Sequence, residues 1–379
     1  MGVSTALHLV QDGVENVVLL EKEHLGAGSS GKSGAILRQH YSREASIRMA
    51  RESLHFYRTF GARYGQDIGF EQPGMLFLAN ESAREALERN VEVQRSVGVD
   101  TRVVDAQEVR ALEPRGTFDD AVLGAWEPEA AYVNPVRTVY ALAEAARTHG
   151  ADIRTATRVR GVLTENGSAR GVRRADGSAI HAPVVVNAAG PWAGPLLDEQ
   201  DLDYPLQAIR PEQAYLEPPG DFGDPTTMYA DLVTGIYWKP EPAGWTRIGK
   251  MSYDGDDDVP DPDDYDEGID QSFIDFTREA ITQRLPAFAQ ATSWGGCGAL
   301  YTITPDAHPL IGPVPEIDGL FLASGFSGHG FKLAPSVGQG LTALITGGDP
   351  GPLDPDLFAV DRLRHDRPVT VPYAYGILG

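Results

Sequence analysis

The first 21 residues of the chain constrain its fold more than any other segment. Small and apolar residues over 2–10, followed by Gly13, predict a helix that begins at residue 2 and ends at a glycine cap. The apolar run 17–20, closed by Glu21, predicts a buried parallel strand with a carboxylate at its carboxyl end. Together they are typical of the second half of a dinucleotide-binding unit, with Gly2 in the place of the third glycine and Glu21 in that of the ribose-binding acid.

In a complete unit of this kind, a strand and two further glycines precede the third glycine, and their backbone approaches the pyrophosphate. These parts lie outside the sequence. We expect a mis-assigned or truncated start, because Met1 fits the ordinary residue before the third glycine. The alternatives are a degenerate site that no longer binds a dinucleotide, and a plain helix–strand unit of any doubly wound protein.

Composition and charge exclude several classes of protein. Hydrophobic residues make up 42% and charged residues 23% of the 379 residues, which is enough apolar material for a real core. A formal net charge of −22 repels phosphate backbones and anionic lipids, so we expect no nucleic-acid and no membrane partner. The single cysteine, Cys297, offers neither an internal disulfide nor a thiolate metal site. We therefore expect no metal and a cytoplasmic location.

The middle of the chain is predicted to begin with a helix over 134–149, which ends at Gly150. Short β-type runs with Asn-Gly and Asp-Gly turns follow and predict antiparallel hairpins. The runs lie at 153–159, 162–163 and 171–174, and the turns at Asn166-Gly167 and Asp176-Gly177. An apolar strand at 183–186 then breaks into a small-residue loop, 187–193, before a further helix. Small residues let the backbone approach a ligand closely, although a tight strand-to-helix turn is the alternative.

An acidic stretch covers residues 254–267, in which nine of fourteen residues are Asp or Glu. Such a run is typical of a solvated loop. A calcium site is a weaker alternative, because the spacing does not match an EF-hand loop. We assign no function to this stretch.

The segment 295–340 is the most informative one, because its glycines precede a helix-compatible stretch over 333–345. Amide groups at the start of that helix would be available to an electron-rich ligand. With this segment the chain resembles the FAD-dependent D-amino-acid oxidase superfamily, and most closely its sarcosine oxidase-like and glycine oxidase-like branch. The resemblance rests on residues 2–23, 28–41, 187–193 and 301–332.

The resemblance implies a clamp for the carboxylate of a substrate. In that family an arginine after the second strand and a lysine closing the Gly-Phe-Ser-Gly-His-Gly-Phe-Lys motif hold this group, and the matching residues are Arg38 and Lys332. Two cations in a partly dry pocket can fix a carboxylate and orient the adjacent C–H bond toward flavin N5. For Arg38 alone, a surface salt bridge is the alternative interpretation.

The resemblance also assigns three further catalytic positions. Tyr301 and Tyr237 match aromatic residues that line the family's substrate pocket, although either could pack in a core with a satisfied hydroxyl. Arg247 matches the lysine that activates dioxygen over the flavin; arginine keeps the charge but is bulkier. Ala299 stands where monomeric sarcosine oxidases have the cysteine that bonds the flavin, so we expect non-covalent FAD.

The FAD-binding residues implied by the resemblance lie in three glycine- or small-residue loops and at the first strand. They are Gly2, Glu21, Lys22, Ser29, Ser30, Ser33, Gly34, Ala188, Gly190, Trp192, Gly325, Gly328, His329, Gly330, Phe331 and Lys332.

We therefore predict an α/β, two-lobed flavoprotein: a Rossmann-like FAD-binding lobe and an interleaved substrate lobe with a mixed or antiparallel sheet. The FAD-binding lobe, N-terminally incomplete, is expected over 1–69, 139–196 and 297–379, and the substrate lobe over 70–138 and 197–296.

The expected reaction oxidises the C–N bond of an amino acid or N-alkyl amino acid to an imine by hydride transfer to flavin N5. No side chain is assigned as acid or base, because the amine can lose its proton on entering a cationic, dehydrated pocket. The alternatives are a dehydrogenase-type subunit of a larger flavoprotein, forming a hetero-oligomer with an electron-accepting subunit, and a non-catalytic relative with impaired FAD binding.

Overall fold

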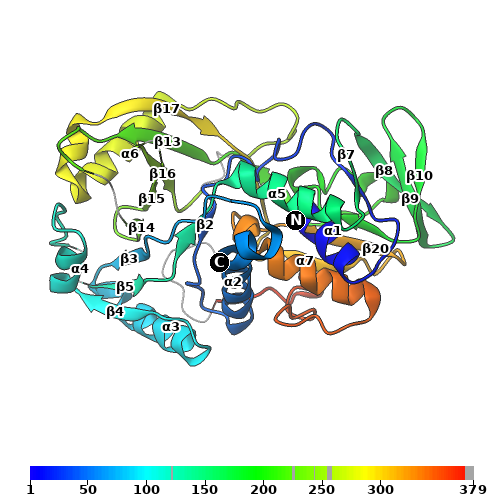
Figure 1. Cartoon of the computed structure of the whole chain (residues 1–379), viewed down its shortest axis with the longest axis horizontal. Helices are drawn as coiled ribbons and strands as arrows, with labels where there is room; N and C mark the ends of the chain where they lie inside the picture. Colours follow the sequence, from blue (N-terminus) through cyan, green and yellow to red (C-terminus); the bar gives the residue numbers. More distant parts are fainter. Residues whose placement is uncertain (121–122, 224–226, 243, 254–257, 372–379) are drawn as a thin grey trace.

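The structure is a computed structural model of the whole chain and describes residues 1–120, 123–223, 227–242, 244–253 and 258–371. The molecule is elongated. A large sheet with helices α3, α4 and α6 occupies one end, and helices α1, α5 and α7 with several small sheets occupy the other (Figure 1). Helix α2 (Glu44–Tyr64) lies between them, where it packs on α7 (Gly330–Thr346).

The predicted helix–strand unit at the start of the chain is present. Helix α1 spans Gly2–Gln11 and β1 spans Val18–Leu20, which pairs in parallel with β7 (Asp152–Arg154). Helix α5 (Pro135–Thr148) connects to β7 and packs on α1, with the Asn134 side chain accepting a hydrogen bond from the Arg137 amide at its start. The helices predicted over 134–149 and 333–345 are thus confirmed, the second beginning three residues earlier, at Gly330.

The expected hairpins form a three-stranded antiparallel sheet of β8 (Val159–Glu165), β9 (Ser168–Arg174) and β10 (Ala179–His181). Two expectations were wrong here. The run 153–159 is not a hairpin strand: β7 ends at Arg154 and pairs in parallel with β1, because the local alternation of apolar residues does not specify a partner. The small-residue loop was expected to lead into a further helix, but it leads only into the three-residue 3₁₀ helix η2 (Gly190–Trp192). Such 3₁₀ turns are common as short connectors.

A second parallel pair joins β11 (Val185–Asn187) to β20 (Leu320–Ser324), and β19 (Leu310–Pro313) adds to β20 in antiparallel orientation. Residue Asn187 ends β11 and holds the turn that follows, since its side chain donates to the Ala193 carbonyl at 2.9 Å and accepts from the Ala189 amide at 3.3 Å. The strand predicted over 183–186 therefore leads directly into a fixed loop.

The large sheet has eight strands in the order β17-β13-β16-β15-β14-β3-β5-β4. It is mixed, because β14 pairs in parallel with β3 and the other neighbours are antiparallel. The bounds are β3 (Met75–Ala79), β4 (Arg102–Asp105), β5 (Leu123–Glu127), β13 (Glu212–Glu217), β14 (Met228–Asp231), β15 (Ile236–Pro240), β16 (Thr246–Lys250) and β17 (Thr292–Gly298).

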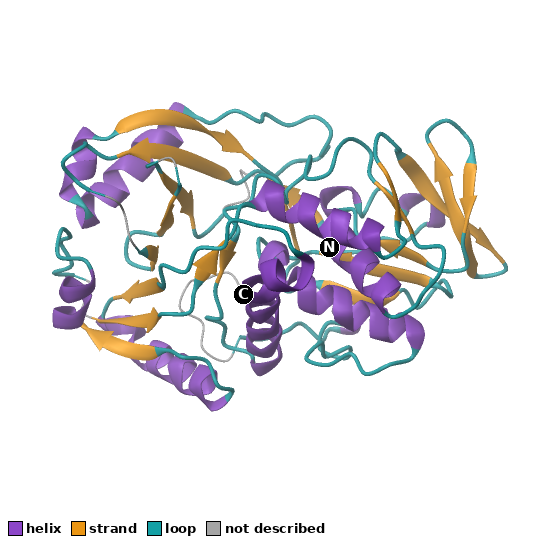
Figure 2. Ribbon diagram, in the orientation of Figure 1, coloured by secondary structure: helices purple, strands orange, loops and turns teal. Residues whose placement is uncertain are grey.

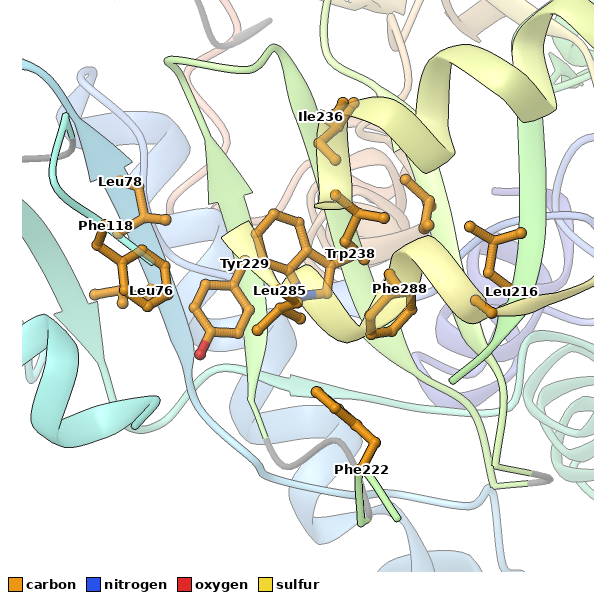
Figure 3. Close-up of a cluster of buried hydrophobic side chains, with 14 of the residues drawn as sticks. Leu76, Leu78, Phe118, Leu216, Phe222, Tyr229, Ile236, Trp238, Leu285 and Phe288 are labelled. Carbon is orange, nitrogen blue, oxygen red and sulfur yellow. The ribbon is translucent and has the colours of Figure 1, made fainter. Parts of the chain in front are cut away.

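Helix α6 (Gln271–Arg284) covers one face of this sheet and builds the hydrophobic core drawn in Figure 3. There the Tyr229 and Trp238 rings stack at 4.5 Å, and Phe288 packs near them. Helices α3 (Arg84–Ser96) and α4 (Ala106–Leu112) pack on β4 and β5. Short 3₁₀ helices complete this end of the chain at η1 (Glu81–Ala83) and η5 (Pro286–Gln290), whereas η3 (Asp198–Gln200) packs on β8 at the other end.

Two short strand pairs connect the ends of the molecule. Strand β2 (Ile36–Leu37) pairs with β6 (Ala131–Tyr132), and β12 (Gln207–Ile209) pairs with β18 (Tyr301–Ile303). Through the first pair, residues that follow the amino-terminal unit reach the large sheet, since Ile36 and Tyr132 pack in one core cluster with residues of β3, β5 and β14. The division into two lobes at the expected boundaries stays a prediction.

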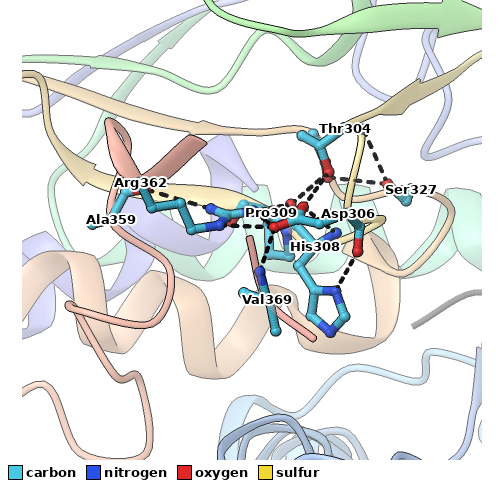
Figure 4. A network of polar contacts seen from close by, with 9 residues as sticks. Thr304, Asp306, His308, Pro309, Ser327, Ala359, Arg362 and Val369 are labelled. Carbon is cyan, nitrogen blue, oxygen red and sulfur yellow. Dashed lines mark hydrogen bonds and ion pairs between the residues drawn. The ribbon is translucent and has the colours of Figure 1, made fainter. Parts of the chain in front are cut away.

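A polar network anchors the segment after α7. The Arg362 guanidinium, in η6 (Arg362–His365), donates to both Asp306 carboxylate oxygens at 2.8–3.0 Å and to the Pro309 and His308 carbonyls at 2.7 Å (Figure 4). The Val369 amide donates to the same carboxylate at 2.8 Å. No helix in the described ranges has the length and apolarity needed to cross a membrane.

Candidate cofactor and anion site

The loop after β1 is closed on itself and carries one buried hydroxyl without a partner. Gly31 packs against the backbone of Gly26, where a Cβ atom would lie 2.1 Å from the Gly26 oxygen, so glycine is required. The Ser29 hydroxyl is buried and makes no hydrogen bond to a described residue. An orphaned buried hydroxyl indicates a polar partner that the protein itself does not supply.

The serines that follow stabilise the loop. The Ser33 side chain accepts a hydrogen bond from the Ala35 amide at 3.0 Å, and Ala35 has a positive φ of 50°. The Ser30 carbonyl accepts from the Ser33 amide at 3.4 Å. A Cβ atom at Gly34 would make only ordinary contact, with Arg247 at 3.7 Å, so Gly34 lies beside the Arg247 side chain without being sterically required.

The first predicted cofactor residues lie at the end of β1 and next to the loop after β11. The Lys22 ammonium lies 3.7 Å from the centroid of a Trp192 ring, and both groups donate to Asp263, at 2.5 and 2.9 Å. Glu21 accepts from the Glu23 amide at 2.9 Å. A Cβ atom at Gly2 would meet Leu19 at an ordinary 3.5 Å, so packing alone does not require glycine there.

The glycine motif before α7 brings the backbone close to other groups. Gly325 and Gly328 have positive φ angles of 72° and 86°, and a Cβ atom on Gly328 would lie 2.9 Å from the Tyr301 ring. A Cβ atom on Gly330 would lie 3.1 Å from Phe326. Helix α7 then begins with no side-chain cap and no acidic residue in its first turn, so its first amides are free to meet an anion. Ala188 and Gly190 lie in the loop after β11, where Ser324 donates to the Gly190 carbonyl at 3.1 Å.

Arg38 follows β2 directly and is buried, with 8% of its surface exposed. Its guanidinium donates to the His40 carbonyl, lies 3.5 Å from His329 Nδ1, and stacks over the Tyr41 ring at 4.6 Å. The Tyr41 hydroxyl also contacts His329 Nδ1, at 2.8 Å. Arg38 is buried and forms no ion pair with any carboxylate of the described residues, so the interpretation as a surface salt bridge does not apply there.

Lys332 lies in the first turn of α7 and is half-buried. Its ammonium group makes no hydrogen bond or ion pair within the described ranges. Burial, and then the positive charge of Arg38, lower the pKa of Lys332 well below its usual range. The neighbouring Phe331 ring stacks on Tyr57 at 5.9 Å, and Tyr57 donates to the Phe331 carbonyl at 2.7 Å, which fixes the start of the helix. The structure therefore brings Arg38, His329 and Lys332 together.

The two predicted pocket tyrosines interact with each other. Tyr237 and Tyr301 lie close enough for each hydroxyl to affect the pKa of the other, and the Tyr253 ring lies edge-on to the Tyr301 ring at 5.7 Å. Burial is the main cause that raises the pKa of both Tyr237 and Tyr301. Gly249 is the cross-strand partner of Tyr237, and a Cβ atom at position 249 would lie 2.4 Å from the Tyr237 ring. The absence of a side chain at Gly249 therefore leaves room for this ring.

Arg247 is held by groups that the sequence did not suggest. It donates to Glu241 at 2.5 Å and to the Gln213 side chain at 2.5 Å, and reaches the Lys32 carbonyl at 3.2 Å. Lys239, which is cross-strand from Arg247, lies 3.0 Å from the same Glu241 carboxylate. Burial lowers the pKa of Lys239 to about 8. Residues 239 and 247 lie opposite one another only through the register of β15 and β16, which no local sequence signal specifies.

A buried carboxyl group beside Arg38 also escaped the sequence analysis. Glu127 ends β5, is completely buried, and accepts from the Gln39 amide at 2.7 Å and from the Gln39 side chain at 3.5 Å. Its other oxygen, Oε2, has no hydrogen-bond partner among the described residues. Burial raises the pKa of Glu127 to about 7, although Gln39 and Arg38 oppose this shift.

The cysteine is placed away from the position that covalent attachment would need. Cys297 is in β17 and its sulfur lies 3.3 Å from the Tyr215 hydroxyl, while the buried Ala299 stands two residues before Tyr301. The described residues contain no group of three or more His, Cys, Asp or Glu side chains that could hold a metal ion.

Comparison with known proteins identifies the family. The family model described as DAO, FAD dependent oxidoreductase, matches residues 1–344. The chain belongs to this family. FAD is accordingly its cofactor, and the orphaned Ser29 hydroxyl and the uncapped starts of α1 and α7 are groups that suit a polar, anionic dinucleotide.

Relatives of this FAD-dependent oxidoreductase include oxidising enzymes and one regulatory protein. It is 27% identical to 4-methylaminobutanoate oxidase (formaldehyde-forming) of Paenarthrobacter nicotinovorans over 93% of the chain and 43% of that protein. It is 29% identical to the mouse pyruvate dehydrogenase phosphatase regulatory subunit over 92% and 40%, and 26% identical to sarcosine oxidase subunit beta of Rhodobacter capsulatus over 92% and 83%. The chain spans about two fifths of the length of the first two.

A solved structure confirms the fold. The L-proline dehydrogenase from P. horikoshii superposes with a TM-score of 0.87 at 27% identity, covering 96% of this chain and 95% of that one. The predicted α/β flavoprotein fold with mixed and antiparallel sheets is therefore correct.

Proposed function

We propose that this FAD-dependent oxidoreductase oxidises the C–N bond of an amino acid or N-alkyl amino acid to an imine, with the substrate carboxylate bound between Arg38 and Lys332. One observation carries the proposal. These two neighbouring cations, one buried and one half-buried, make no ion pair with any carboxylate of the described chain. Buried charges are normally paired, so an unpaired pair of cations calls for an anionic ligand.

The electrostatics of the pair favour a carboxylate. Arg38 and burial both disfavour the charged form of Lys332, as its lowered pKa records. An anion placed between the two groups offsets their repulsion and restores the charged ammonium. The planar Arg38 guanidinium offers a two-pronged donor set that matches the two oxygens of a carboxylate, and His329 and Tyr41 hold that guanidinium from the other side.

The other residues orient the substrate and hold the cofactor. FAD supplies the two-electron acceptor when it is bound. The Ser29 hydroxyl, the loop around Gly26 and Gly31 and the amides at the starts of α1 and α7 would hold it without a covalent bond, since Ala299 offers no thiol. The Tyr237–Tyr301 pair would line the substrate pocket and exclude water from one side of it.

The final electron acceptor is the least constrained part of the proposal. Arg247 lies beside Gly34 of the cofactor loop, but its charge is shared with Glu241. Relatives are named both as oxidases and as dehydrogenases, and one is a subunit of sarcosine oxidase. A dehydrogenase-type subunit that passes electrons to a partner protein is therefore the second candidate for this chain.

A non-catalytic role has one supporting observation, the relative named as a regulatory subunit. The unpaired cations favour a ligand-binding site instead, because retaining two desolvated charges without a ligand only destabilises the fold.

The deciding experiment compares substrates in the FAD-loaded chain. Under anaerobic conditions, N-methyl amino acids or cyclic amino acids should bleach the flavin absorbance, while matched amines without a carboxylate should bleach it far more slowly. Arg38→Lys should slow the reaction despite preserving the charge, because a planar fork is replaced by a point donor. Equal rates for amines with and without a carboxylate would contradict the clamp, and the absence of bleaching with every amine would favour the non-catalytic role.

A further inference from the structure

The buried carboxyl group of Glu127 is not used by the proposed reaction, yet it belongs to the same polar cluster as Arg38. Strand β2 ends at Leu37, which pairs with Ala131 of β6, and the Arg38 segment follows immediately. Glu127 lies four positions before the start of β6, and its carboxylate accepts a hydrogen bond from the amide of Gln39, the residue after Arg38, at 2.7 Å. The segment 127–132 thus holds the chain on both sides of Arg38, once by backbone pairing and once through the Glu127 side chain.

Two oxygens in this contact lack a donor. Glu127 Oε2 and Gln39 Oε1 are both buried and make no hydrogen bond to a described residue, although the two side chains touch at 3.5 Å through the other atoms. Both oxygens are acceptors while Glu127 is ionised, so they cannot satisfy one another. A proton on Glu127, or a water molecule, supplies the missing donor.

The charges that face Glu127 are few. Arg38 is the cation that most strongly favours its ionised form, Glu129 is a carboxylate on its own segment, and Tyr41 is an ionisable group that interacts with it. The His329 imidazole contacts the Arg38 guanidinium, whereas the His40 imidazole stacks on Phe77 of β3, whose register partner Ala125 lies on the same strand as Glu127. Burial strongly disfavours the ionised carboxyl group, and Arg38 is its main opposing charge, so the pKa of Glu127 lies at about 7.

We propose that Glu127 takes up a proton when an anionic ligand binds Arg38 and releases it when the ligand leaves. This rests on the proposed function, because the ligand is the substrate carboxylate. A carboxylate on Arg38 neutralises the cation that stabilises ionised Glu127 and adds a second negative charge nearby. The proton comes from water, and no bond other than that to the proton forms or breaks. Glu127 is a positioning residue in this scheme, since it acts on the substrate through Arg38.

The sign of the pH dependence follows from linkage. Because the ligand-bound state holds the proton more tightly than the free state, ligand affinity is highest where Glu127 is already protonated. Affinity should fall as the pH rises above about 7, by up to tenfold per pH unit, until the pKa of the bound state is reached. Lys332 faces the same ligand and contributes proton uptake of its own, because its pKa is also lowered in the free site.

The test measures protons taken up when acetate binds the FAD-loaded chain. Calorimetric titrations at about pH 8, in two buffers with different heats of ionisation, give that number directly. Glu127→Gln should take up fewer protons than the wild type and should bind acetate with a flatter pH profile. Lys332→Met should bind acetate more weakly but should still take up the part of the protons that Glu127 accounts for. Glu144→Gln, which changes an exposed carboxylate paired with Arg147 on α5, is the control and should keep the wild-type proton uptake.

The outcomes separate the two proposals. Acetate binding with equal proton uptake in the wild type and Glu127→Gln would overturn the role of Glu127 and leave the clamp intact, whereas a wild type that binds no acetate at any pH would overturn both. Infrared spectra of the wild type, with glutamate labelled by ¹³C, provide a measurement that needs no variant. Acetate should increase the carbonyl band of a protonated buried glutamic acid, and an unchanged band would refute the proposal.

Discussion

Arg362 and Arg38 are both buried guanidinium groups, with 1% and 8% of their surfaces exposed, but their surroundings are opposite. Arg362 meets both oxygens of Asp306 and two backbone carbonyls, so its charge and its donors are satisfied within the protein. Arg38 has a carbonyl and an imidazole as partners and a second cation, Lys332, nearby. The Glu127 carboxyl group beside it makes no ion pair with it, and burial raises the pKa of Glu127 to about 7. The first arrangement stabilises the fold, and the second leaves charge available for a ligand.

The difference teaches how to recognise a binding site from geometry alone. A buried cation whose charge and donors are all paired within the protein indicates a role in stability, because the protein's own groups offset the desolvation of the cation. A buried cation without an anion is destabilising unless something outside the chain offsets it, and it therefore indicates function. The two regions should respond to mutation in opposite ways.

The largest effect is expected at the paired site. Asp306→Asn keeps the shape of the side chain but leaves the Arg362 charge uncompensated, so we expect the free energy of unfolding to fall by about 3 to 5 kcal/mol. Urea denaturation followed by circular dichroism measures this. Asp361→Asn is the control, since this carboxylate is more exposed and contacts His365 and Arg367 near the surface. If Asp306→Asn lowered the free energy of unfolding by less than about 1 kcal/mol, the Arg362 network would contribute no more than an ordinary surface ion pair.

The next effect concerns the unpaired site, where binding and stability should separate. Lys332→Met should weaken binding of a carboxylate inhibitor to the FAD-loaded chain by about 2 to 5 kcal/mol, because one partner of a buried charge pair is lost. The free energy of unfolding should not decrease, since the variant removes a desolvated charge that has no partner in the described protein.

Inhibitor titrations monitored by the flavin spectrum measure the affinity, and FAD content should hardly change. Arg48→Met on the exposed face of α2 is the control, because Arg48 is exposed, pairs with Glu44 and lies outside the site. If Lys332→Met destabilised the fold as much as Asp306→Asn while binding stayed normal, the contrast between the two regions would be wrong.

Local patterns in the sequence predicted much of the framework. Apolar spacing and glycine caps located α1 and α5, and the glycine motif located the start of α7 to within three residues. The resemblance suggested Arg38 and Lys332, and the structure brings these two close together. Each of these features is carried by residues near one another in sequence or by a motif, which is why they were accessible.

Long-range partners were not accessible. Glu127 meets Gln39 across 88 positions and Asp306 meets Arg362 across 56, and neither contact leaves a local pattern. Glu241 is an ordinary acidic residue in the sequence and becomes a shared partner of Lys239 and Arg247 only when β15 and β16 pair. The wrong hairpin prediction for 153–159 has the same cause, because strand partners are set by tertiary packing.

The third prediction uses Glu127 to connect the two regions through pH. Its folded-state pKa of about 7 lies above the ordinary 4.5, so the folded protein binds this proton more tightly than the unfolded chain. Stability from this group is therefore present below about pH 4.5 and is lost as the pH rises to about 7, by at most about 3 kcal/mol.

Glu127→Gln should remove this loss, because the amide is neutral at every pH. The free energy of unfolding of the variant relative to the wild type should rise between about pH 4.5 and about pH 7.5, as measured by urea denaturation at both values. A constant difference across that range would mean that Glu127 titrates normally. Asp306→Asn should show no such rise near neutral pH, since the pKa of Asp306 is lowered, with Arg362 opposing the effect of burial.

The smallest effect is expected where the acidic stretch meets Lys22. Asp263 accepts hydrogen bonds from Lys22, Arg158 and Trp192, and these donors bring its pKa down to about 2 although burial opposes them. Residues 254–257 of the stretch lie outside the described residues, and the others include this contact as well as solvated side chains. Because the Asp263 carboxylate is 31% exposed, it belongs with surface ion pairs rather than with Asp306.

Asp263→Asn should therefore lower the free energy of unfolding by about 1 kcal/mol or less at low salt. The difference should vanish at about 1 M salt, where the Debye length is about 3 Å, whereas the loss in Asp306→Asn should persist because buried pairs are screened much less. Asp264→Asn changes the adjacent carboxylate, which makes no ion pair within the described ranges, and should leave stability unchanged. Urea denaturation at both salt concentrations measures all three variants. A loss of stability in Asp263→Asn that persists at about 1 M salt would show that Asp263 forms a buried structural ion pair like Asp306. The contact between the acidic stretch and Lys22 would then stabilise the fold in the same way as the Arg362 network.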